Sequence, residues 1–136
     1  MSFARVWFIG YTNPTRMIEQ LRPKPAPHWG FYGQLLHALL DSLLLYLPLA
    51  LMGRIPPTPS NISIIPTEKY YWVLVWLSPL VLGAEWLLAA AFTHVVLRLS
   101  GQRSDMDQIL NISGMLSFLA IPIALPFDIM FMRSPL

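Results

Sequence analysis

The sequence predicts an all-α membrane protein with three transmembrane helices and an N-terminal amphipathic interfacial helix. Three apolar runs carry this prediction, and they cover residues 33–53, 70–99 and 109–132. Each run is at least 21 residues long, whereas about 20 residues at ~1.5 Å per residue cross the ~30 Å core of a bilayer. Composition agrees, because 55% of the residues are hydrophobic and 12% are charged, about half the ~25% charged content of a soluble domain.

The N-terminal part differs in character from the rest, so residues 1–32 are predicted as a cytoplasmic segment and residues 33–136 as the transmembrane domain. Asn13 followed by Pro14 is typical of a helix start, and the pattern predicts a short amphipathic helix to about Leu21 on the membrane surface. The alternating prolines of residues 22–27 favour an extended connector. The aromatic residues that follow are expected at the interface, just before the first span.

The second and third runs contain prolines that predict irregular helices. The second run would form a helix of about 45 Å, longer than the bilayer core, and Pro79 and Gly83 favour one tilted or kinked span rather than two. The third run contains Pro122 and Pro126, so its far half is expected to be bent or broken.

The basic residues beside the runs predict the orientation. With three spans, the N-terminal segment and the loop between the second and third runs share one side, which carries six Lys and Arg residues against three on the other. The positive-inside rule then puts the N-terminus in the cytoplasm. We expect the chain in the inner or plasma membrane of a prokaryote.

Ionisable residues inside the runs are the main candidates for a functional role. Such side chains are costly in the bilayer core and normally face a partner or a cavity. His37 and Asp41 are four residues apart on one face of the first helix, where they can hydrogen-bond directly. Either these groups hold helices together or they form a proton or ion path. The five candidates are His37, Asp41, Glu85, His94 and Asp128.

Polar residues on two sides of the second helix point to a further subunit. Glu85 and His94 are nine residues apart, which puts them on nearly opposite faces. Three helices can hardly bury both faces, so either this helix is central or the chain contacts another subunit. Small residues permit close helix packing, within the chain or with a partner. The candidates for a partner interface are Gly83, Ala90, Gly114 and Ser117.

Motifs for catalysis and metal binding are missing from the sequence. It contains no HExxH, no Glu-x-x-His pair, no EF-hand loop, no Gly-x-Ser-x-Gly elbow and no cysteine. The basic residues are scattered around the spans, so nucleic acid is not expected as a partner. We therefore expect no enzyme, no cofactor and no metal, and the expected partners are membrane lipids and other membrane protein subunits.

One stretch resembles a known family. Residues 94–110, HVVLRLSGQRSDMDQIL, are similar to the signature loop of Yip1-domain membrane proteins, in which a helix ending in His and a basic residue meets a glycine-rich turn and a new helix. Ser117 matches a small residue of that helix. Residues 13–21 resemble the amphipathic helix that precedes the first span in bacterial members. The family typically has about five spans, so the resemblance implies a shortened C-terminal part and an integral membrane protein without a settled reaction.

The function that these observations favour is a non-catalytic, Yip1-like packing or adaptor subunit of a larger membrane protein complex. The alternative is a small transporter, or a proton- or ion-conducting subunit, that uses the intramembrane carboxylates and histidines. A third and weaker hypothesis is an intramembrane enzyme.

Overall fold

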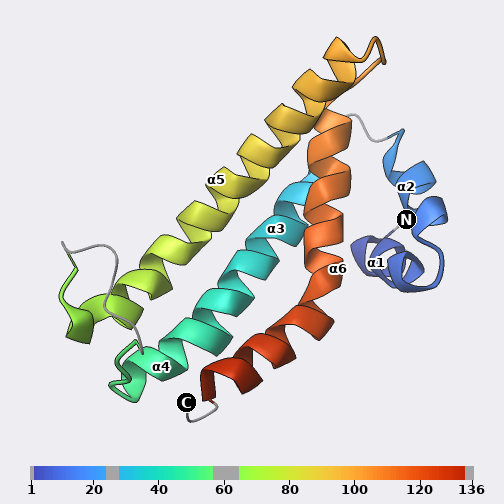
Figure 1. Ribbon diagram of the computed structural model, residues 1–136. Coiled ribbons are helices and arrows are strands. Elements are labelled where there is room, and N and C mark those ends of the chain that lie inside the picture. Colours follow the sequence, from blue (N-terminus) through green and yellow to red (C-terminus); the bar gives the residue numbers. More distant parts are fainter. Residues whose placement is uncertain (1, 24–27, 57–64, 134–136) are drawn as a thin grey trace.

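The computed structural model of the chain describes residues 2–23, 28–56 and 65–133. Three long helical spans lie side by side and alternate in direction, with a small pair of helices against one flank (Figure 1). Each span is long and apolar enough to cross a bilayer. The predicted fold class, three membrane helices preceded by an amphipathic helix, is confirmed, and the described residues contain no strand.

The first span comprises α3 (His28–Leu40), a π-helical segment (Asp41–Tyr46) and α4 (Leu47–Leu51). The π-helical segment leads into Pro48, which has no N–H for a regular helical bond, and the Leu47 N–H donates to the carbonyl five residues earlier. The helix begins at His28, before the predicted start of this span at residue 33. The aromatic residues expected ahead of the span therefore form its first turns.

Glycines bring α3 and α6 (Met106–Arg133) into direct backbone contact. A Cβ atom on Gly114 of α6 would overlap the Gly30 carbonyl of α3, and one on Gly33 would lie 2.7 Å from the Gly114 carbonyl oxygen. Close approach of this kind is how membrane helices gain packing energy without help from water. At the same place, Asn111 Oδ1 accepts a hydrogen bond of 2.7 Å from the Gly30 N–H, which satisfies a free donor at the start of α3.

The second span is one continuous helix, α5 (Tyr70–Leu99), which follows a short 3₁₀ turn. The prediction of a single span over 70–99 is thus correct. Pro79 has no N–H, so the carbonyl of Val75 four residues earlier has no helical donor, and the Ser42 hydroxyl donates to it at 2.5 Å. In α6 the two prolines also lie inside one helix, which bends in its second half but does not break (Figure 1).

The N-terminal segment contains two helices rather than one. The predicted helix is present as α2 (Pro14–Leu21), and Asn13 Oδ1 caps it by accepting from the Arg16 N–H at 2.9 Å. A second helix, α1 (Phe3–Thr12), precedes it and was not predicted. Both pack against α6, and the Tyr11 hydroxyl donates to the Leu119 carbonyl at 2.9 Å. The fully buried side chains in this contact are Val6, Met17, Leu21 and Met115.

The end of α2 and the loop between α5 and α6 lie at the same end of the bundle, whereas α1 lies beside the middle of α6 at Met115 and Leu119. Gln108, in the first turn of α6, donates a side-chain hydrogen bond of 2.8 Å to the backbone carbonyl of Arg22. Because the three spans alternate in direction, the segment before the first span and the loop between the second and third spans must lie at the same end. Most of the predicted connector at residues 22–27 lies outside the described residues, so its extended form stays a prediction.

Candidate functional site

A polar cleft of about 350 Å³ lies where the three spans meet. Its polar lining residues lie three apart in α3 and four apart in α6, so each of these two helices presents one polar face to the cleft, and α5 contributes the neighbouring Glu85 and Trp86. The backbone contact between α3 and α6 brings two of these faces together, and α5 closes the third side. The cleft is lined by Gln34, His37, Leu82, Glu85, Trp86, Ala89, Ser113 and Ser117.

His37 links α3 to α6 within this cleft. Its Nδ1 lies 2.6 Å from the Ser117 hydroxyl, and its Nε2 lies 3.4 Å from a carboxylate oxygen of Asp41. A neutral ring with its proton on Nε2 satisfies both contacts, because it donates towards Asp41 and accepts from Ser117. The contact between His37 and Asp41 that their spacing predicts is therefore present, and Ser117 extends it to a second helix.

Two further hydrogen bonds attach α5 to the other spans. The Gln34 side-chain amide donates to the Leu82 carbonyl at 3.0 Å, and the Trp86 indole N–H donates to the Ser113 hydroxyl at 3.0 Å. Trp86 and Ser113 were not predicted as site residues. The feature of the sequence that points to them is their position beside predicted residues. Trp86 directly follows Glu85, and Ser113 lies one helical turn before Ser117.

Glu85 differs from the other polar residues of the cleft because its carboxylate has no hydrogen bond or ion pair with any described residue. It lies midway along α5, and its side chain is exposed at the open side of the cleft. In a bilayer this position is close to the centre of the hydrocarbon core, where an unpaired carboxylate is most costly. The carboxamide oxygen of Gln34 is also buried without a partner in the described part of the chain.

Of the five predicted ionisable residues, His37 and Glu85 line the cleft, Asp41 contacts His37 outside its lining, and the remaining two lie elsewhere. His94 Nδ1 lies 2.5 Å from the Ser104 hydroxyl in the loop that follows α5, so a local contact satisfies this ring. Asp128 is exposed in the far part of α6 and does not line the cleft. Of the two polar sides predicted for the second helix, only the side with Glu85 is left without a partner in the described chain.

The four small residues predicted for a partner interface have different surroundings. Ala90 is buried within the chain, Gly114 contacts α3, and Ser117 binds His37. Gly83 has no atom within 4 Å of the place where a Cβ would lie, and it lines a separate apolar cavity of about 160 Å³ between α3 and α5. A role of these residues in contact with another chain stays a prediction.

The chemistry available in the cleft is hydrogen bonding and proton exchange. Within the described ranges, no three His, Asp or Glu side chains are close enough together to hold a metal ion. No protein-family model, no curated protein and no solved structure matches this chain. The resemblance to Yip1-domain proteins therefore stays a prediction.

Proposed function

We propose that the chain is a non-catalytic, Yip1-like subunit of a larger membrane protein complex, and that its polar cleft receives a transmembrane helix of another subunit. Glu85 is the observation that carries this proposal. It is an exposed, unpaired carboxylate midway along an apolar helix, next to a cleft whose other polar groups mostly bind one another.

The occupant that fits this site is an apolar helix with a Lys or Arg side chain near the middle of its span. A carboxylate in the hydrocarbon core is stabilised by a cation that forms a hydrogen bond with it, and both charges are then removed from lipid contact. The burial of α5 supports the same proposal. In its most apolar window 6% of the residues are buried, against 33% in each of the other two spans.

The proposed orientation places the end with α2 and the loop between α5 and α6 in the cytoplasm of a prokaryotic cell. The support is the excess of Lys and Arg at that end. Because the chain has no cysteine, single cysteines introduced at the exposed positions Met52 and Gln102 can be labelled from either side to test it.

Two exposed aromatic residues of α5 allow a matched crosslinking test in native membranes. Phe92 lies two turns after Glu85 on the same face, whereas Trp76 lies on the nearly opposite face, and both are well exposed. We expect a benzophenone amino acid at position 92 to give a discrete protein adduct and the same group at position 76 to give none. The crosslinked peptide should come from an apolar span that contains Lys or Arg.

Two controls show whether the crosslink at position 92 depends on the charge of Glu85 and on a basic residue of the partner. Glu85→Gln should reduce the adduct at position 92 at least tenfold, as should removal of the basic residue from the crosslinked span. The proposal fails if position 92 gives only lipid adducts, if Glu85→Gln leaves the adduct unchanged, or if the adduct is a second copy of this chain.

A second candidate function is proton or ion conduction, and the contacts of His37 favour it. Asp41, His37 and Ser117 form a continuous chain of polar groups, and Glu85 lines the same cleft. Such a chain can pass a proton by exchange at the imidazole ring.

The test of this second candidate is proton flux in vesicles that contain the purified protein and a pH-sensitive dye. Asp41→Asn and Glu85→Gln are expected to lower the flux at least tenfold without a loss of folded protein. Asp128→Asn is the matched control, because Asp128 is an exposed carboxylate outside the cleft. A wild-type flux equal to that of protein-free vesicles would exclude this function.

A further inference from the structure

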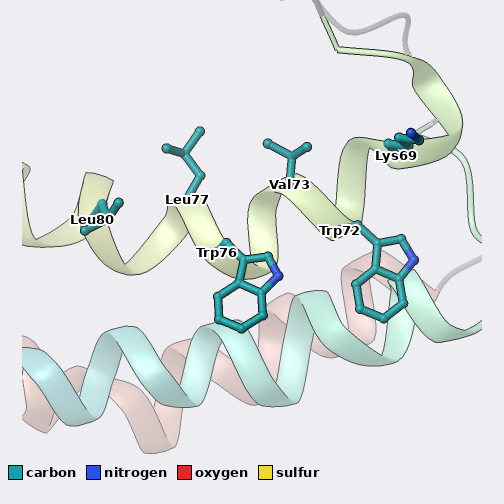
Figure 2. Close-up of a pocket in the computed structure, with 6 residues that line it drawn as sticks. All are labelled: Lys69, Trp72, Val73, Trp76, Leu77 and Leu80. Carbon is teal, nitrogen blue, oxygen red and sulfur yellow. The ribbon is translucent and has the colours of Figure 1, made fainter.

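A second surface of α5 lies away from the polar cleft. It is an apolar groove of about 450 Å³ near the start of the helix. Its lining residues are three or four positions apart and so share one helix face, which helical periodicity places roughly opposite Glu85. In Figure 2 the indole rings of Trp72 and Trp76 lie along one edge of this face, and Val73 and Leu77 lie along its other edge. The groove is lined by Lys69, Trp72, Val73, Trp76, Leu77 and Leu80.

The charge at one end of this groove is positive. Lys69 occupies the N-cap position of α5, and its ammonium group has no hydrogen bond or ion pair with a described residue. The continuous helix begins with the 3₁₀ turn at Thr67, which carries Glu68, so the cation at this end of the groove is Lys69 alone. Glu68 does not line the groove.

The groove extends from the headgroup level into one leaflet of a bilayer. From Lys69 to Leu80 the helix rises about 16 Å, and the groove ends about 8 Å before the level of Glu85 at the centre of the core. Lys69 precedes the apolar run and therefore lies at the level of the lipid phosphates, and Trp72 lies in the interfacial layer that tryptophan favours. Trp76 is 77% exposed and Leu80 is 71% exposed, so both are open to a neighbouring molecule.

We propose that this groove binds one anionic phospholipid. The phosphate pairs with Lys69, and one acyl chain lies along the groove from Trp72 to Leu80. A phospholipid fits this surface because its phosphate meets the lysine at the interface and its acyl chain fills the apolar groove in the core beneath. This site is independent of the proposed partner at Glu85, which lies on the other side of α5.

Competition between two lipids tests the proposal. The full-length protein is given phosphatidylglycerol and phosphatidylcholine of identical acyl chains in equal amounts, and the bound lipids are counted by native mass spectrometry. We expect about a fivefold preference for phosphatidylglycerol, the effect of one lysine near the phosphate layer. Lys69→Gln should abolish the preference, whereas Trp76→Ala should weaken the binding of both lipids.

Two matched variants show whether the effect is local. Arg103→Gln removes an exposed cation from the loop after α5, and Leu88→Ala removes an exposed apolar side chain outside the groove; both should bind lipid as the wild type does. Equal binding of the two lipids by the wild type would overturn the proposal. A preference that survives Lys69→Gln, or displacement of the lipid by inorganic phosphate alone, would overturn it as well.

Discussion

The two ways in which the spans of this chain are joined differ in kind. The α3–α6 pair is held by backbone contact at Gly30 and Gly114, with the buried Asn111 between the two helices. The α5 helix packs its first turns against α4, where Leu49, Ala50, Tyr71 and Val75 are buried together. The rest of the helix is attached through individual hydrogen bonds from Ser42, Gln34 and Trp86, and most of its surface is open. The first joint depends on close backbone contact, whereas the second depends on an apolar cluster at one end of α5 and on a few polar atoms along its length.

This difference follows from the solvent. Lipid is as apolar as the helix surfaces, so only close packing or polar contacts can join helices in a bilayer. Where two helix backbones touch at glycines, no side chain lies between them that could change rotamer to absorb a shift of one helix. Hydrogen bonds from side chains permit small shifts. We infer that α3 and α6 form the fixed part of the bundle, and that α5 is the span whose position responds to a partner or a lipid.

The largest expected effect comes from a methyl group at the rigid joint. Gly30→Ala places a Cβ against the backbone of Leu110 and Asn111, which cannot turn away as a side chain can, and should cost about 3 kcal/mol of unfolding free energy. Gly83→Ala is the matched control, because nothing lies within 4 Å of its Cβ. It should be neutral or stabilise the helix by up to ~1 kcal/mol. Detergent-titrated unfolding measures both, and equal losses would refute the distinction between the two joints.

A smaller loss is expected from the polar contact inside the same joint. Asn111→Ala leaves the Gly30 N–H without its acceptor in a buried site, which should cost about 1–2 kcal/mol. Gln108→Ala, three residues earlier on α6, removes an exposed hydrogen bond and should change the unfolding free energy by less than ~0.5 kcal/mol. If the two variants unfold alike, the contact between Asn111 and Gly30 contributes little to the joint.

The spans themselves could be predicted from the sequence because bilayer thickness sets the length of an apolar run. Residues 70–99 form one helix as predicted, and Asn13 caps a helix that ends at Leu21. The contact between His37 and Asp41 also follows from local spacing, since residues four apart on a helix are neighbours. These predictions need no knowledge of how the helices are arranged.

Contacts between helices could not be predicted, because nothing in one helix specifies the rotation of the next. Hence the pairing of His37 with Ser117 and of Trp86 with Ser113 was missed. The additional helix α1 was missed for a related reason. Its apolar side is short, and it is stabilised as a helix by packing against Met115 and Leu119 of α6, far along the chain.

The smallest expected effect tests the attachment of α5 through Ser42. In Ser42→Ala the Val75 carbonyl loses its donor, and hydrogen bonds of this kind in membrane proteins contribute about 0.6 kcal/mol. Pro79→Ala restores a backbone N–H to the position four residues after Val75, so the helix can satisfy that carbonyl itself. A double-mutant cycle should therefore show Ser42→Ala costing ~0.6 kcal/mol with Pro79 present and close to zero with Pro79→Ala. An equal cost in both backgrounds would mean that Ser42 contributes through packing, and α5 would then have two polar attachments beside its apolar cluster with α4.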